Sequence, residues 1–264
     1  MVERDPDGQI RTEQRGHILL IIIDRPEKYN GFTPKMLAEL AKAYSRLERE
    51  RELRVGVLCA EGKHFTAGLD LPKMAPLRAE GRPLFPPGEV DPVNLRAPLR
   101  TKPLIAAMKG ISFTVAVELM LAADIVIAAD DCRFTQMEVK RGIMPGAGAT
   151  FRMVERAGWG NAMKVLLTGD EFTAQEALQY NFVQEVVPLG KELDRALELA
   201  QKIADQAPLA VQAVIENART AVDHGWLAAY SKIADMQQRL YNTDDAKEGV
   251  LSFQEKRPAK FTGR

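Results

Sequence analysis

Residues 17–23 read HILLIII, an almost unbroken apolar run that ends at a turn beginning with Asp24. A strand of this composition is buried on both faces, as strands of parallel sheets are, because an exposed face would need polar residues at every second position. Thr33 and Pro34 then supply the cap and the first position of an amphipathic helix, and residues 54–60 (RVGVLCA) form a second apolar strand. The order strand, helix, strand predicts a right-handed crossover between parallel strands.

Strand and helix patterns keep alternating through the middle of the chain. Apolar runs predict strands at residues 103–109, 124–129 and 182–187, and the run at 116–122 suits the start of a buried helix. This alternation is typical of parallel sheets, because each parallel connection must return along the sheet before the next strand begins. We therefore expect an α/β fold.

The last part of the chain, from residue 190 onward, carries helical periodicity only. We therefore divide the chain into a core at residues 1–190, which holds the site, and a helical region at residues 191–264. Residues 72–96 are rich in proline and glycine and have little apolar periodicity. They are expected to form a long mobile loop, of the kind that serves as a lid or is partly disordered.

Two isolated glutamates stand out because their surroundings are apolar. Glu118 lies at the head of the run VELMLAA, and Glu138 directly precedes the turn-rich segment VKRGIMPGAGAT. A carboxylate in such a place must find a partner or hold a proton, since burying an unpaired charge costs several kcal/mol. Both are candidates for acid and base chemistry. An exposed helix position for Glu118 and an ordinary loop acid at Glu138 fit the local pattern equally well.

The charge balance limits the classes of partner. The chain of 264 residues has 36 basic and 36 acidic residues, so it carries no bulk field that would attract nucleic acid or an anionic membrane. We expect neither as a partner. An anionic ligand would have to be bound by a local group of basic residues.

Cysteine and histidine usage gives no metal-binding pattern. Cys59 and Cys132 do not have the close spacing of a metal-binding or disulfide motif, which indicates a reducing compartment. His17, His64 and His224 are also widely separated, so no metal site is expected. The N-terminal residues are charged rather than apolar, and no apolar run reaches the roughly 18 residues needed to span a bilayer. We expect a cytoplasmic protein.

Three blocks carry a resemblance to a known family: HFTAGLDL, KGISFTVAVELMLAADIVIA and FTQMEVKRGIMPGAG. In this order and spacing they resemble the crotonase family, also called the enoyl-CoA hydratase/isomerase family. IIIDRPEKYNGF, LLTGDEFTAQEAL and FQEKRPAKFTGR extend the likeness over nearly the whole chain. The resemblance implies a crotonase-like spiral of ββα units with a C-terminal helical trimerisation region, and a homotrimer or homohexamer.

The resemblance also implies a reaction. Family members act mostly on acyl thioesters of coenzyme A, and the hydratases among them use two glutamates, which correspond to Glu118 and Glu138. The backbone N–H groups of Leu69 and Val115 correspond to the oxyanion hole that holds the thioester oxygen. The implied function is addition of water to a trans-2-enoyl-CoA, giving a 3-hydroxyacyl-CoA in fatty-acid or amino-acid breakdown.

The turn before the first glutamate departs from the family pattern. Hydratases usually have a run of glycines there, whereas this chain has Thr114, Val115 and Ala116. A β-branched valine resists the close approach and unusual dihedrals that glycine allows. Double-bond isomerisation, lyase or hydrolase chemistry on acyl-CoA therefore stays an alternative, as does a noncatalytic paralogue that binds acyl-CoA.

Contacts with coenzyme A come from the resemblance alone. They are assigned to Lys28, Ala67, Gly68, Asp70, Leu71, Phe253 and Lys256. Coenzyme A is part of the substrate, and no separate cofactor is implied. For Lys28 and Lys256 an ordinary surface position fits equally well, since most lysines are exposed.

Other conspicuous residues have structural explanations. His64 has no fixed partner in the pattern, so a structural or solvent-facing role is favoured. Asp124 begins a strand, where a capping or ion-pair role is expected. The side chains that could line an acyl tunnel, or simply fill the core, are Phe113, Met74, Met137 and Met144.

Overall fold

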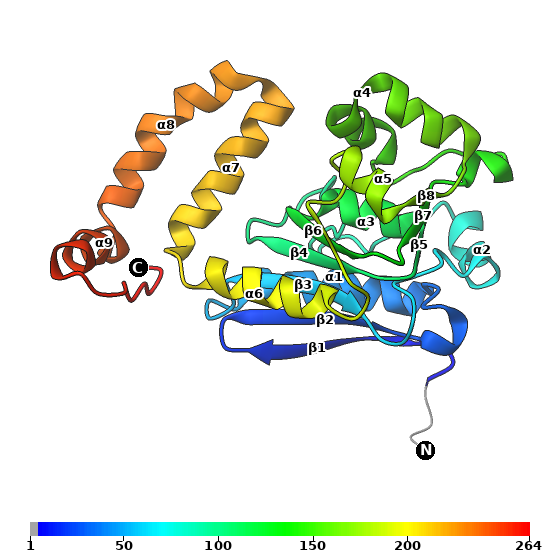
Figure 1. The fold of residues 1–264 in the computed structure, drawn as a ribbon, viewed down its shortest axis with the longest axis horizontal. Coiled ribbons are helices and arrows are strands. Elements are labelled where there is room, and N and C mark those ends of the chain that lie inside the picture. The colour runs from blue at the N-terminus through cyan, green and yellow to red at the C-terminus, as the bar shows by residue number, and fades with distance from the viewer. Residues whose placement is uncertain (1–4) are drawn as a thin grey trace.

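The computed structural model describes residues 5–264, which form two sheets surrounded by helices (Figure 1). The larger sheet has six strands, in the spatial order β1 (Gln9–Arg15), β2 (Ile18–Asp24), β3 (Val55–Ala60), β4 (Leu104–Met108), β6 (Ile125–Ala129) and β9 (Glu185–Val187). β1 is antiparallel to β2, and the other neighbours are parallel. All five predicted strands are confirmed, although the last begins later than expected, at Glu185.

The composition of β2 follows from its central position. Every residue of the strand is buried. Alternate residues starting at Leu19 belong to a core cluster with Leu37 and Leu40 of helix α1 (Pro34–Arg49). The intervening residues starting at Ile18 belong to a second cluster with alanines of α6 (Glu192–Ala204). Because both faces are covered, neither tolerates polar side chains.

The smaller sheet was not predicted, and neither was β1. The smaller sheet consists of β5 (Ile111–Phe113), β7 (Arg133–Thr135) and β8 (Phe172–Thr173). These strands have three residues or fewer, too short to show a period of two. β1 reads QIRTEQR and lies at the sheet edge with its polar residues in solvent, so its sequence resembles a loop.

The remaining helices include the expected ones at residues 116–122 and beyond residue 190, together with short ones at 26–28, 71–79 and 138–141 that were not predicted. They are η1 (Pro26–Lys28), α2 (Leu71–Ala79), α3 (Val115–Ala122), η2 (Glu138–Arg141), α4 (Ala149–Thr168), α5 (Ala174–Gln179), α7 (Pro208–His224), α8 (Trp226–Tyr241) and α9 (Asp244–Glu255). Thr33 caps α1 by accepting from the backbone N–H of Met36 at 3.3 Å. Thr173 and Glu176 form a capping box at the start of α5.

Residues 72–96 are not the unstructured loop that was expected. Their first part belongs to α2, and Phe85, Val90 and Val93 are buried in the main core. The carboxylate of Asp91 accepts hydrogen bonds from the backbone N–H groups that follow it, including that of Val93 at 3.2 Å. Isolated apolar anchors and side-chain-closed turns have no periodicity, so the sequence pattern did not reveal them.

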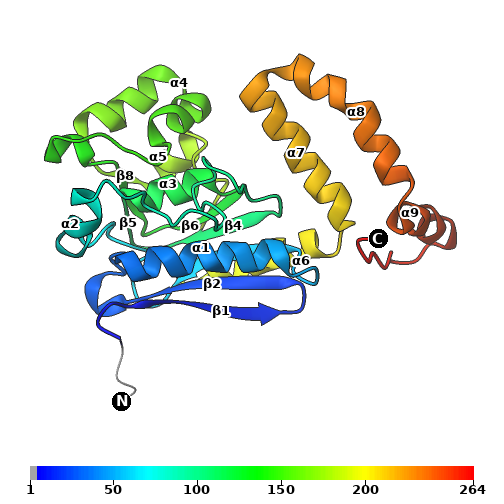
Figure 2. The ribbon, with the colours of Figure 1, turned by 180° about the vertical axis from the view of Figure 1, so that it is seen from behind.

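The C-terminal helices form an arm beside the core. Figures 1 and 2 show α7 and α8 as an antiparallel pair standing away from the sheet, with α9 at the far end. α6 packs against the sheet itself, although it was grouped with the helical region at residues 191–264. The division at residue 190 stays a prediction. No helix among residues 5–264 is long and apolar enough to cross a membrane.

A charged cluster at Asp124 joins the core to the arm. The guanidinium of Arg100, whose side chain is 1% exposed, donates to Asp124 Oδ2 at 2.6 Å. Asp124 also accepts from the backbone N–H of Leu104 at 2.7 Å and from Arg219 of α7 at 3.2 Å. The expected ion-pair role of Asp124 is confirmed.

We predict that Asp124→Asn lowers the free energy of unfolding by about 3 kcal/mol, because the buried Arg100 guanidinium loses its counter-ion. The measurement is urea denaturation at neutral pH. Asp223→Asn is the control, since Asp223 is exposed on α7 and makes no hydrogen bond in the described chain. Equal stability of the two variants would contradict this role of Asp124.

Candidate active site

One cavity of about 370 Å³ brings the predicted catalytic groups together. Leu69, Val115, Glu118 and Glu138 all line it, although they come from separate parts of the chain. The other lining residues are Met74, Leu77, Arg82, Leu84, Thr114, Ile143, Met144, Gly146 and Ala147. The cavity is thus mainly apolar, with two carboxylates in its wall, which is the usual composition of a small-molecule site.

Two backbone N–H groups at this cavity have no acceptor in the described chain. The segment 68–70 pairs with Phe32 through Gly68 O and Asp70 N at 2.8 and 2.9 Å, so the N–H of Leu69 points away from this bridge. Val115 is the first residue of α3, where helix geometry leaves the N–H unbonded. Two free donors at the wall of one cavity are suited to a developing oxyanion, and the α3 dipole adds positive potential.

Where typical hydratases have glycines, this chain has one residue with a strained backbone, and that residue is Thr114 rather than Val115. Thr114 has φ 53° and ψ −110°, a region that favours glycine, whereas Val115 is helical. The unusual dihedral expected at the valine therefore lies at its neighbour Thr114. A strained residue of this kind costs about 1–3 kcal/mol and is typical of functional sites.

Glu118 is buried, with 4% of its surface exposed. Its Oε1 accepts from the backbone N–H of Ala147 at 2.6 Å and of Ala149 at 3.4 Å, at the start of α4. Burial raises the pKa of Glu118 to about 7, and the backbone hydrogen bonds limit the rise. The carboxyl group therefore exchanges protons readily near neutral pH. The exposed helix position that the pattern also allowed is excluded.

Glu138 opens the short helix η2 and is half-buried. Its Oε2 is buried without a hydrogen-bond partner in the described chain. Burial raises the pKa of Glu138, and the charge of Glu138 contributes to the raised pKa of Glu118. Two acids whose charged forms disfavour each other can hold one proton between them.

The residues assigned to coenzyme A are divided between two regions. Ala67, Gly68 and Leu71 lie in or beside the Leu69 loop, and Lys28 is exposed on η1. The carboxylate of Asp70 is engaged by the buried Arg25 at 2.8 Å.

Phe253 and Lys256 lie far from the cavity within this chain. They belong to the region of α9, on the opposite side of the molecule from α2 (Figures 1 and 2). The Phe253 side chain projects into solvent, with 85% of its surface exposed. The structure therefore does not bring these two residues to the site of the same chain.

Sequence reasoning missed part of the cavity wall. Met74 and Met144 line the cavity as considered, but Phe113 and Met137 do not. Leu77, Arg82 and Leu84 come from the segment that was read as an irregular loop. The only sequence signal for these three residues is that they follow the block HFTAGLDL, which contains Leu69. Across residues 5–264, no group of three or more His, Cys, Asp or Glu side chains is arranged to hold a metal.

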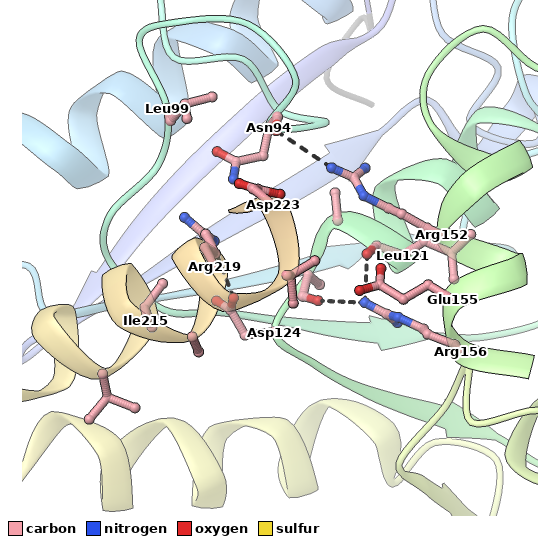
Figure 3. A pocket seen from close by; sticks show the side chains of 15 residues that line it. Asn94, Leu99, Leu121, Asp124, Arg152, Glu155, Arg156, Ile215, Arg219 and Asp223 are labelled. Carbon is pink, nitrogen blue, oxygen red and sulfur yellow. Dashed lines mark hydrogen bonds and ion pairs between the residues drawn. The ribbon is translucent and has the colours of Figure 1, made fainter. Parts of the chain in front are cut away.

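A larger cavity, about 520 Å³, lies elsewhere, between α4 and the arm helix α7. Figure 3 shows Arg152 and Arg156 of α4 on one side and Arg219 and Asp223 of α7 on the other, with Asp124 hydrogen-bonded to Arg219. Each guanidinium donates at least one hydrogen bond within the chain; for example, Arg156 Nη2 donates to the carbonyl of Leu121 at 2.6 Å, although Arg152 Nη1 is buried without a partner in the described chain. None of the predicted catalytic residues lines this cavity, so we place the site in the smaller one.

Comparison with known proteins identifies the family of the chain. The family profile described as enoyl-CoA hydratase/isomerase matches residues 13–264. The chain belongs to the enoyl-CoA hydratase/isomerase family. It has the crotonase fold, and a structure described as a probable enoyl-CoA hydratase/isomerase from Mycobacterium abscessus superimposes with a TM-score of 0.93 at 44% identity, covering 97% of this chain and 99% of that one.

Curated relatives include both hydratases and dehydratases. The enoyl-CoA hydratase EchA19 of Mycobacterium tuberculosis is 34% identical, over 100% of this chain and 99% of that protein. The carnitinyl-CoA dehydratase of Proteus mirabilis is also 34% identical, over 95% of this chain and 97% of that protein. An enzyme of this family acting on acyl-CoA thioesters is thus supported.

We predict that Glu118→Gln stabilises the protein at high pH. Folding raises the pKa of this group from 4.5 to about 7. Below pH about 4.5 the group is protonated in both the folded and the unfolded state, so the folded state has its full stability. As the pH rises through about 7 the buried group must ionise, and this stability is lost. Glutamine is neutral throughout. At pH 8 the variant should be more stable than the parent by about 3 kcal/mol, and at pH 4.5 the difference should vanish.

Chemical denaturation at both pH values measures this effect. The matched control is Glu155→Gln, an exposed glutamate on α4, which should leave the pH dependence of stability unchanged. If Glu118→Gln behaved like the control, the burial of an ionisable group at this position would be contradicted.

Proposed function

We propose that this protein is an enoyl-CoA hydratase that adds water across the double bond of a trans-2-enoyl-CoA to give a 3-hydroxyacyl-CoA. One observation carries the proposal: two carboxyl groups with raised pKa values and two unpaired backbone N–H groups line a single apolar cavity. The carboxyl groups supply proton transfer on both sides of a double bond. The N–H groups supply stabilisation of a thioester oxygen.

The roles of the two glutamates follow from their environments. Glu118 accepts backbone hydrogen bonds, which favour its charged form, so we assign it as the base that removes a proton from water while the hydroxyl oxygen bonds to the β-carbon. Glu138, with an unpartnered Oε2, holds the proton that passes to the α-carbon. The negative charge that develops on the thioester oxygen is met by the N–H groups of Leu69 and Val115.

A second reaction class is supported by a different observation. The strained Thr114 turn replaces the glycines of typical hydratases, which suits isomerase, lyase, hydrolase or dehydratase chemistry on the same thioester. Comparing crotonyl-CoA with a 3-enoyl-CoA and a 3-hydroxyacyl-CoA separates these reactions. Hydration is favoured because both glutamates face the cavity.

In this proposal coenzyme A enters as part of the substrate. Lys28, Ala67, Gly68, Asp70 and Leu71 are proposed to contact coenzyme A beside the Leu69 loop. No separate cofactor is invoked, because the side chains and backbone of the site provide every proton and hydrogen bond of the reaction. We also propose a cytoplasmic location, where coenzyme A thioesters of fatty-acid breakdown are processed.

We propose further that copies of the chain assemble through the arm, as a homotrimer or homohexamer. The support is a set of apolar side chains on the arm, each more than half exposed: Val214, Val222, Trp226, Leu227, Tyr230, Tyr241, Val250 and Phe253. Exposed apolar groups in such number mark interaction surfaces. In an assembly, Phe253 and Lys256 would contact coenzyme A bound to a neighbouring copy.

We predict that Glu118→Gln and Glu138→Gln each reduce the turnover of crotonyl-CoA by about 10²–10⁴-fold, because each removes one proton transfer. The measurement is loss of the conjugated enoyl thioester absorbance. Glu155→Gln is the control and should retain parental turnover, because its side chain does not line the catalytic cavity. Parental rates in either test variant would exclude the two-glutamate mechanism.

We predict that the parent protein has a solution mass three or six times the 29.3 kDa of the chain. Leu227→Asp combined with Tyr230→Asp should lower this mass, since both side chains lie exposed on α8. Light scattering coupled to gel filtration measures it. Trp159→Asp, at an exposed tryptophan of α4, is the control outside the arm. A parent with the mass of one chain would rule out the assembly.

A further inference from the structure

The backbone of Thr114 is held in its strained conformation from both sides. Its N–H donates to the carbonyl of Thr135 at 2.8 Å, and its own carbonyl accepts from Val117 at 2.9 Å and Glu118 at 3.2 Å. Glycine would occupy φ 53° at no steric cost, whereas threonine is strained there. The strain therefore indicates that the side chain of Thr114 has a role at this position.

The Thr114 side chain lies against the other loop of the oxyanion hole. A Cβ added to Gly68 would lie only 2.4 Å from Thr114 Oγ1, so this hydroxyl occupies the space that a side chain at Gly68 would need. Gly68 directly precedes Leu69, and Thr114 directly precedes Val115. The hydroxyl therefore belongs to the residue before one free N–H donor and lies beside the residue before the other.

The hydroxyl is also available for a ligand. Thr114 lines the catalytic cavity, and its Oγ1 neither donates nor accepts a hydrogen bond within the described chain. A threonine hydroxyl carries one donor that rotates to suit an acceptor. The neighbouring N–H groups of Leu69 and Val115 are themselves donors, so they cannot accept a hydrogen bond from this hydroxyl. A negatively charged oxygen bound between those two N–H groups would provide one.

We propose that the Thr114 hydroxyl is a third hydrogen-bond donor to the thioester oxygen of the substrate, and hence a catalytic residue. This inference rests on the proposed acyl-CoA function of the cavity, although it does not depend on hydration in particular. The side chain then adds a donor that a glycine turn lacks, and the backbone strain is the accompanying cost. The alternative role of Thr114 is to fill the space beside Gly68.

Three substitutions separate these roles. Thr114→Val keeps the shape but removes the hydroxyl, Thr114→Ser keeps the hydroxyl but removes the methyl group, and Thr114→Gly removes both and relieves the strained backbone. Loss of one oxyanion donor lowers kcat by about 10²–10³-fold in a two-donor hole, so with two backbone donors retained we expect about 10–100-fold.

With crotonyl-CoA as the substrate, Thr114→Val and Thr114→Gly should lose kcat to this extent with KM nearly unchanged, and Thr114→Ser should stay within about threefold of the parent. If valine reduced folding, the glycine variant would still test the hydroxyl, because glycine accepts the backbone conformation. Parental kcat in the glycine variant would overturn the proposal. Equal losses in the serine and valine variants would show a packing role and overturn it as well.

A spectroscopic measurement keeps this test independent of turnover. In the Glu118→Gln background, the infrared carbonyl stretch of bound crotonyl-CoA should lie at higher wavenumber with Thr114→Val than with Thr114, because a lost donor leaves the carbonyl less polarised. An unchanged frequency would exclude a hydrogen bond from Thr114. A parent that binds crotonyl-CoA without turning it over would fail the hydratase proposal, while the infrared comparison would still decide the role of Thr114.

Discussion

The hydrogen bonds between Glu118 and the start of α4 connect two walls of the candidate site. Oε1 of Glu118 accepts from Ala147 and Ala149, so α3 and the chain at the start of α4 are fixed relative to each other by the carboxyl group that we propose as the base. The carboxyl group is buried, yet its direct partners are backbone N–H groups rather than a cation at ion-pair distance. Its pKa is therefore raised to about 7 instead of being lowered.

A second constraint is the close contact of the loops that carry Leu69 and Val115. Gly68 has no room for a Cβ because Thr114 Oγ1 lies in its place. Both residues at this contact have positive φ, 106° at Gly68 and 53° at Thr114. The hydrogen-bonded turn of Thr114 and the bridge of the Leu69 loop to Phe32 keep both loops in place. Stability of the surrounding core thus maintains local backbone strain beside the two free N–H groups.

Much of the fold could be predicted from periodicity, and part of the site could not. The strands β2, β3, β4 and β6 are buried on both faces and therefore have continuous apolar sequences. Short strands such as β7 and the polar edge strand β1 have no such signal. The wall of the candidate cavity was only partly predicted. Leu77 and Leu84 come from a segment in which the residues that contact the core do not recur at regular intervals.

The sequence by itself determined the parallel core and marked Glu118 and Glu138 as unusual, because a charge in an apolar run conflicts with burial. It also showed that glycines were replaced near Val115, and the family resemblance gave that position its meaning. Only the tertiary structure decided that the strain falls on Thr114, that the two glutamates face one cavity, and that Phe253 lies far from it. These outcomes depend on contacts between residues distant in sequence, and no local pattern records such contacts.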